Sequence, residues 1–169
     1  LDPKAYRKAV ALLAESEFID IFGVENSLTP AMDLFTKLGY LGLTCRLNTD
    51  AYLQQIGAGH LPHGAVAVAF SHSGSSADTV KALRLAKSHG AKTIAITNAI
   101  GAPLASWADV TLLTGRDSHT IYGNAIFSRV ADTALVDMLY MGVILSGYGR
   151  DLMRSWDRPV DGVYFLPQL

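Results

Sequence analysis

The chain of 169 residues is half hydrophobic and only 17% charged, and it carries a formal charge of −1. This length and composition predict one domain, residues 1–169, with a sizeable core, and they exclude a long solvated tail. Because the chain has no basic run, it lacks the electrostatic footprint of a nucleic-acid-binding domain.

Helix caps and strand ends divide the chain into alternating elements. Asp2 as N-cap and Pro3 in the first turn predict an opening helix, and Thr49 or Asp50 caps a later one. Gly23 ends the first strand, and Gly90 ends the fourth helix. In chain order, we expect helix 3–15, strand 18–22, helix 30–38, strand 43–47, helix 51–58, strand 64–70, helix 77–89, strand 93–97, short helix 104–107, strand 110–113 and helix 121–145.

Continuous apolar strands that alternate with helices predict a parallel sheet covered on both faces. The fold class is therefore α/β, a three-layer αβα sandwich. We expect a five-stranded sheet in the flavodoxin-like order 2-1-3-4-5, a core over about 16–147 and a C-terminal tail over 148–169. In such a sheet, ligands bind beyond the carboxyl ends of the first and third strands, where these strands separate.

The last predicted helix has an apolar stripe wide enough to face both the core and a partner, and a fully buried helix is the alternative. The stripe comprises Val130, Ala134, Met138, Met141 and Leu145, and is widened by Ile126, Leu135 and Leu139.

The expected cellular location depends on two kinds of segment, a membrane span and a signal peptide. The most apolar stretch, 138–149, is too short to cross a bilayer of about 30 Å, and no signal peptide opens the chain. The single cysteine, Cys45, excludes an intramolecular disulfide and predicts a buried, reduced thiol. We expect a soluble cytoplasmic protein that does not contact a membrane.

The most informative segment joins the third strand to the next helix and reads Ser71, His72, Ser73, Gly74, Ser75, Ser76. Hydroxyls, backbone N–H groups and a helix N-terminus are the donors that bind a phosphate, and Gly74 allows a tight turn. The alternative is an ordinary serine-rich turn that caps a helix.

A second polar loop favours the phosphate site. Asn26 and Ser27 follow the first strand, so they are expected at the same crevice as the serine-rich segment. Thr97 and Asn98, at the end of the fourth strand, are expected to form a polar wall beside it.

Competing motifs are absent. The turn after the first strand is not G-x-G-x-x-G, and the chain has neither a P-loop nor a G-x-S-x-G elbow. The five histidines show no metal-ligand spacing. We predict no metal and no cofactor.

These residues resemble the sugar isomerase (SIS) domain, over roughly residues 2–147. Gly23 with Ser27 is similar to the family's first loop, and Ser71, Ser73, Gly74 and Ser76 are similar to its Ser-x-Ser-Gly-x-Ser/Thr loop. Further features resemble the effector half of RpiR-type transcriptional regulators: Asp2 with Pro3, Asp50 with Gln54, 95–97, Pro103 with Leu104, Ala108 with Asp109, and Ser128 with Arg129 through Asp137.

The resemblance implies a phosphorylated sugar as ligand, a homodimer formed through the last helix, and DNA binding only through a helix-turn-helix domain. That domain is not in this chain, which is expected to be a truncated form or a solitary relative. Ser27, Ser71, Ser73 and Ser76 are the implied phosphate and sugar contacts, and the backbone N–H groups of 72–76 cradle the phosphate.

Two positions leave alternatives open. His72 either donates to the ligand or points to solvent. Glu25 stands where similar chains have glycine, and its carboxylate repels a phosphate unless it points away or binds a sugar hydroxyl.

Catalysis requires a base, commonly glutamate in SIS isomerases. The only glutamates are Glu15, Glu17 and Glu25, and later candidates are limited to Asp117, His119 and Asp132. This favours a ligand-sensing domain without catalytic residues. An aldose-ketose isomerase is the alternative, and a pseudo-domain with an occluded pocket is a third.

Overall fold

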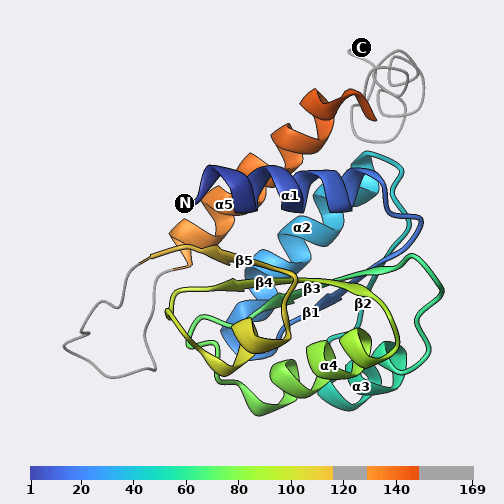
Figure 1. Cartoon of the computed structure of the whole chain (residues 1–169), viewed down its shortest axis with the longest axis vertical. Helices are drawn as coiled ribbons and strands as arrows, with labels where there is room; N and C mark the ends of the chain where they lie inside the picture. Colours follow the sequence, from blue (N-terminus) through green and yellow to red (C-terminus); the bar gives the residue numbers. More distant parts are fainter. Residues whose placement is uncertain (116–128, 149–169) are drawn as a thin grey trace, which may run out of the picture.

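The computed structural model describes residues 1–115 and 129–148. Its sheet has five parallel strands in the order β2-β1-β3-β4-β5, which confirms the predicted topology (Figure 1). The strands are β1 (Ile19–Phe22), β2 (Cys45–Leu47), β3 (Val66–Phe70), β4 (Lys92–Thr97) and β5 (Val110–Leu113).

Helices cover both faces of this sheet and complete the three layers. Figure 1 shows α1 (Pro3–Ala14), α2 (Leu28–Tyr40) and α5 (Val130–Val143) on one face, and α3 (Ala51–Ala58) and α4 (Ala77–Ser88) on the other. Three short helical segments join them: η1 (Glu25–Ser27), η2 (Pro103–Trp107) and η4 (Ile144–Tyr148), the last of which extends α5.

The predicted caps are confirmed. The Asp2 carboxylate accepts from the Lys4 amide at 2.9 Å, and Asp50 accepts from the Leu53 amide at 2.9 Å. Helix α2 begins two residues earlier than expected, because Pro30 lies in its first turn, where a missing N–H breaks no helical bond. Of the helix expected at 121–145, residues 121–128 lie outside the described part, as do 149–169 of the tail.

The two faces of the sheet bury side chains of different size. Val66, Val68 and Phe70 face the core shared with α1, α2 and α5. Ala65, Ala67 and Ala69 belong to the core on the other face, together with alanines of α3 and α4. Helix α4 packs on this alanine-lined face, and six residues, 71–76, connect it to the end of β3.

Edge strand β2 is joined to β1 by an ion pair whose carboxylate is buried and whose guanidinium is partly exposed. Asp20 is 1% exposed, and Arg46 donates to it from Nε at 3.0 Å and Nη2 at 2.7 Å. Burial raises the pKa of Asp20, although Arg46 opposes the change. Burial also raises the pKa of the neighbouring Cys45 thiol to about 12.

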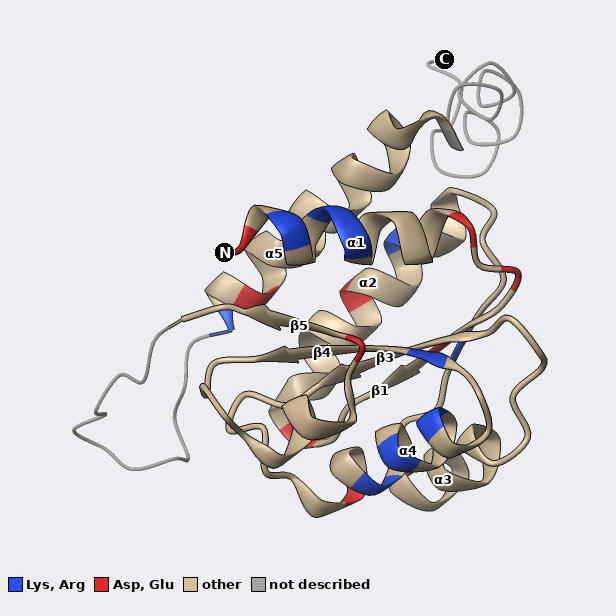
Figure 2. Ribbon diagram, viewed as in Figure 1, with Lys and Arg blue, Asp and Glu red and all other residues tan. Residues whose placement is uncertain are grey.

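Helix α5 has one buried and one exposed apolar face. Leu135, Val136, Leu139 and Val143 are buried in the core with α1 and α2. The α5 stripe, defined here by the exposed side chains of Val130, Met138, Met141 and Leu145, is 74%, 46%, 49% and 76% exposed. The fully buried helix is therefore excluded, and Figure 2 shows no charged residue on the outer end of α5.

Residues Val130–Gly147 are long and apolar enough to cross a membrane, with a mean hydropathy of 1.4 over 18 residues. The sequence predicts an apolar stretch, 138–149, that is too short to cross a bilayer. The helical segment is longer than this stretch because it begins at Val130. A single helix of this kind is weak evidence for a span, since core helices pass the same test. Here the buried face of α5 packs on α1 and α2.

Candidate functional site

The segment between β3 and α4, called the serine loop (residues 71–76), is held at both ends by Ser71. The buried Ser71 donates its amide to the Ile96 carbonyl at 3.0 Å, which continues the ladder between β3 and β4. Its Oγ donates to Ser76 Oγ at 3.1 Å. Ser71 therefore fixes the position of Ser76, the residue at which α4 begins.

Gly74 makes the turn of the serine loop possible. It has φ of +63°, its amide donates to the Ser71 carbonyl at 2.9 Å, and its carbonyl accepts from the Leu104 amide at 2.9 Å. A Cβ at this position would lie 2.3 Å from Ala102 Cβ and 2.8 Å from Thr97 Oγ1. Both the backbone conformation and the close approach thus require glycine.

The two residues expected as a polar wall contact the loop through His72. Thr97 Oγ1 and the Asn98 amide donate to the His72 carbonyl at 3.1 and 3.0 Å. Asn98 Nδ2 lies 3.4 Å from His72 Nε2. Thr97 is fully buried, so these residues fix the backbone of the serine loop from within the protein.

The second loop, called the β1 turn (residues 23–27), depends on a buried side chain from α3. Gln54 accepts from the Gly23 amide at 3.2 Å and donates to the carbonyls of Gly23 at 2.7 Å and Asn48 at 2.8 Å. The turn also places Glu25 at φ of +51°, where an L-residue is strained. This backbone conformation favours glycine at position 25.

The serine loop and the β1 turn meet at a polar cavity of about 120 Å³. It contains the predicted residues Asn26, Ser27, His72, Ser73 and Ser76. Ser71, Gly74, Ser75, Thr97 and Asn98 do not line it, and Ser71, Gly74, Thr97 and Asn98 instead hold the serine loop in place. The cavity is lined by Val24, Glu25, Asn26, Ser27, His72, Ser73, Ser76 and Arg129.

Arg129, at the start of α5, was not predicted as a site residue. Its side chain is 17% exposed, and its Nε lies 4.0 Å from Asp132 Oδ2. The i,i+3 spacing of Arg129 and Asp132 is typical of a pair on one helix face. The fold brings the start of α5 to the carboxyl end of the sheet (Figure 1), which no spacing in the sequence indicates.

The same aspartate faces His72. Asp132 is 5% exposed, and His72 Nδ1 lies 3.9 Å from its Oδ2. Burial and the Arg129 charge lower the pKa of His72, and the Asp132 carboxylate only partly opposes this. His72 is therefore neutral at pH 7, and Arg129 supplies the positive charge of the cavity.

This arrangement suits an anion. Ser27, Ser73 and Ser76 supply hydroxyls, the first turn of α4 supplies unpaired N–H groups, and Arg129 supplies a guanidinium. Over residues 1–115 and 129–148, no group of three or more His, Cys, Asp or Glu side chains could hold a metal ion. Asp117 and His119 lie outside these residues.

Known proteins share this fold and sequence. Residues 12–142 match the SIS domain family. An uncharacterized HTH-type transcriptional regulator of Caldanaerobacter subterraneus subsp. tengcongensis is 32% identical over 91% of this chain and 54% of its own length. The regulator RpiR of Escherichia coli K12 is 29% identical over 73% of this chain and 42% of its own. The chain thus spans about half the length of these curated relatives.

A solved structure agrees with this match. Vibrio vulnificus NanR, complexed with ManNAc-6P, is 26% identical to this chain, with a TM-score of 0.82 over 92% of this chain and 60% of its own. Because the family match covers most of the chain and includes both loops of the polar cavity, the protein belongs to the SIS domain family, and it is similar in sequence to HTH-type transcriptional regulators that include RpiR.

Proposed function

We propose that this chain is the phosphosugar-binding, ligand-sensing domain of an RpiR-type transcriptional regulator. The observation that carries the proposal is the polar cavity, in which the serine loop, the β1 turn and the N-terminus of α4 direct donors to one small volume. Phosphate is the group that such donors recognise. The similar NanR holds a phosphosugar, ManNAc-6P.

Regulation requires more than this chain. Its curated relatives are HTH-type regulators about twice as long as the part it matches. In this proposal, a helix-turn-helix domain joined to this one binds DNA, and the whole regulator acts in the cytoplasm. Binding of the phosphosugar changes how the two domains are arranged relative to each other.

Binding without turnover is favoured by the residues of the cavity. Among the described residues that line it, Glu25 is the only glutamate, and it is exposed at the rim. His72 faces the carboxylate of Asp132 through Nδ1 and the amide of Asn98 through Nε2. Both ring nitrogens thus face protein groups, which leaves neither directed at a substrate carbon.

The test is thermal unfolding with a panel of phosphosugars, including ManNAc-6P, and with their unphosphorylated parents. A ligand at 100 times its Kd adds about 2.7 kcal/mol of stability. We expect a rise for a phosphosugar alone, which Ser73→Ala reduces and Ser75→Ala retains, because Ser75 belongs to the same loop but does not line the cavity. The absence of a rise with every phosphosugar would contradict the proposal.

Chromatography of the same incubations separates the two functions. An unchanged phosphosugar agrees with a sensing domain. Conversion between aldose and ketose would instead identify an isomerase.

We further propose a homodimer formed through the α5 stripe. The stripe adjoins an apolar groove of about 640 Å³ between α1 and α5, which Leu145 and Gly142 help to line. A second copy of the stripe matches this groove in apolar character, and burial would remove exposed methionine and leucine side chains from water. Light scattering is expected to give a dimer that Met141→Lys converts to a monomer, whereas Tyr52→Lys, on α3 of the other face, leaves it intact.

A further inference from the structure

Arg129 has donors that the protein itself does not use. Its Nε and Nη1 are buried, and neither has a hydrogen-bond partner among the described residues. Buried donors without partners are costly, and charged donors more so. Such a group is rare in a folded protein unless something else completes its hydrogen bonds.

The neighbouring carboxylate does not meet this need. Asp132 Oδ2 lies 4.0 Å from Arg129 Nε, which is outside hydrogen-bond distance, and the same oxygen lies 3.9 Å from His72 Nδ1. Asp132 balances the charge of the guanidinium without accepting its protons. The guanidinium therefore remains able to donate to an oxygen within the cavity.

The size of the polar cavity indicates which chemical group supplies the oxygen that accepts from Arg129. Its volume of about 120 Å³ has room for several water molecules, and therefore for one phosphate group. Ser73 and Ser76 line the same volume as Arg129. A phosphate bound by the serine loop is thus expected to lie within reach of the guanidinium.

Charge points the same way. Among the described residues that line the cavity, Arg129 is the only permanent cation, while Glu25 is an anion. A phosphate monoester is dianionic near neutral pH, so its binding here needs a cation beside the neutral hydroxyls. Planar guanidinium groups donate in pairs to phosphate oxygens, which adds both strength and orientation.

We propose that Arg129 is a ligand-binding residue whose guanidinium donates to the phosphate group, and that it selects phosphorylated over unphosphorylated sugars. This inference rests on the proposed phosphosugar function and adds a contact from α5 to those of the serine loop and the β1 turn. Because Arg129 immediately precedes Val130, the bound phosphate is also connected to the helix that carries the α5 stripe.

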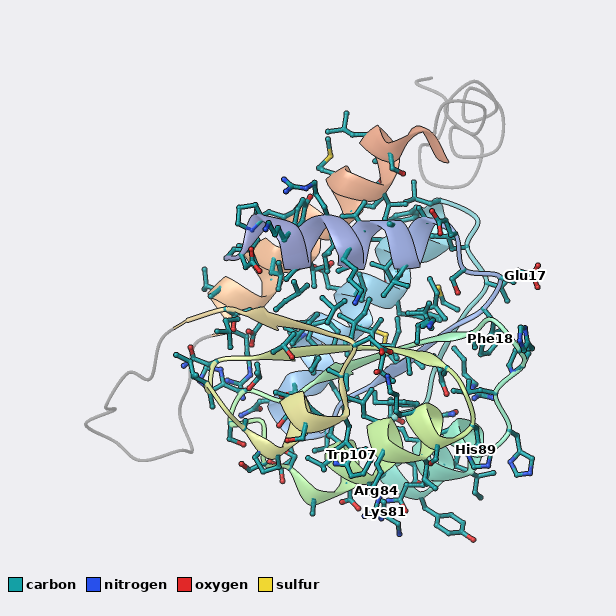
Figure 3. All side chains as sticks on the ribbon, viewed as in Figure 1. Glu17, Phe18, Lys81, Arg84, His89 and Trp107 are labelled. Carbon is teal, nitrogen blue, oxygen red and sulfur yellow. The ribbon has the colours of Figure 1, made fainter. Side chains whose placement is uncertain are left out.

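The test compares Arg129→Gln and Arg129→Lys with wild type in titrations with inorganic phosphate and with the phosphosugar that gives the largest thermal shift. Arg129→Gln is expected to weaken both by about tenfold or more, and Arg129→Lys by less, since lysine keeps the charge but loses the paired donors. The unphosphorylated sugar should bind wild type and both variants equally weakly. Arg84→Gln is the matched control, because Arg84 stacks on Trp107 at 5.9 Å on the outer side of α4 (Figure 3).

Unfolding of the ligand-free variants separates binding from a structural role. We expect Arg129→Gln to stay folded and to unfold near the wild-type temperature, because the lost charge balance of Asp132 offsets the removal of a largely buried charge without hydrogen bonds. Unchanged phosphate affinity in Arg129→Gln, with affinity lost in Ser73→Ala, would overturn the role of Arg129 and leave the proposed function intact. Loss of folding in both Arg129 variants would also overturn it, and wild type that binds neither probe would refute the proposed function itself.

Discussion

The two loops that line the polar cavity keep their shape by different means. The serine loop is fixed by packing and backbone bonds, with Gly74 pressed against Ala102 and tied to Ser71 and Leu104. The β1 turn has a backbone bond from the Ser27 amide to the Val24 carbonyl, is anchored to α3 by one side chain, Gln54, and carries the strained Glu25. One side of the site is therefore rigid through close packing, whereas the other depends on a few polar contacts that substitution can tune.

Gly74→Ala should break the rigid loop and give the largest effect. The new Cβ would meet Ala102 at 2.3 Å, at a φ that disfavours alanine, so we expect a loss of about 3 kcal/mol or more in the free energy of unfolding. Urea unfolding measures it. Gly39→Ala in α2 is the control, since no atom lies within 4 Å of its Cβ, and it should stabilise by up to about 1 kcal/mol. Equal stability of the two variants would contradict the close packing of Gly74.

Gln54→Leu should release the β1 turn. It removes three hydrogen bonds and leaves the polar groups of Gly23 without their partner, which is expected to cost about 2 kcal/mol. Phosphosugar affinity should fall as well, because Ser27 belongs to this turn. The neighbouring Gln55→Leu, which loses one exposed bond to Asp78, should change stability by less than about 0.5 kcal/mol. If Gln54→Leu had the same urea midpoint as the wild type, the β1 turn would not depend on the hydrogen bonds of Gln54.

Substitutions of Glu25 should sharpen the contrast in the opposite direction. Glu25→Gly relieves a positive φ and removes a charge, so we expect up to about 1 kcal/mol of added stability and tighter phosphosugar binding. Glu25→Gln removes the charge alone and should tighten binding without the gain in stability. Calorimetric titration and urea unfolding distinguish the two. Weaker binding in both variants would show instead that the carboxylate accepts from a sugar hydroxyl.

A pH series should give the smallest effect, from His72 in the serine loop. Its folded pKa is lowered below the ordinary 6.5, so below pH 6.5 the unfolded chain binds a proton that the folded chain resists. The neutral form of His72 therefore contributes to the free energy of unfolding above pH 6.5. This contribution is lost as the pH falls from 6.5 through the lower folded pKa. His72→Gln should reduce the decline in urea midpoint between pH 7 and pH 5. An identical slope in the variant would assign the decline to other groups.

Local signals in the sequence explain how much of the structure could be predicted. Asp2 and Asp50 act as caps as expected, and the order of the five strands follows from their continuous apolar runs. The two loops of the cavity follow from the rule for parallel sheets combined with the hydroxyls of Ser27 and Ser73.

What could not be predicted depends on tertiary geometry. The i,i+3 spacing pairs Arg129 with Asp132, and only the fold shows that the guanidinium lines the cavity while Asp132 also faces His72. Likewise, no spacing rule places the Thr97 hydroxyl on the His72 carbonyl. Such contacts join elements far apart in sequence, where periodicity carries no information.

The edge strand β2 gives the chain a built-in reporter. Cys45 is its only cysteine, and with a pKa of about 12 roughly one thiol in ten thousand is ionised at pH 8. Since thiolates react with alkylating reagents, the native chain should be labelled slowly, and labelling should accelerate when β2 separates from β1. Timed alkylation followed by mass spectrometry would therefore record opening of the sheet edge, with and without ligand, in the unmodified protein.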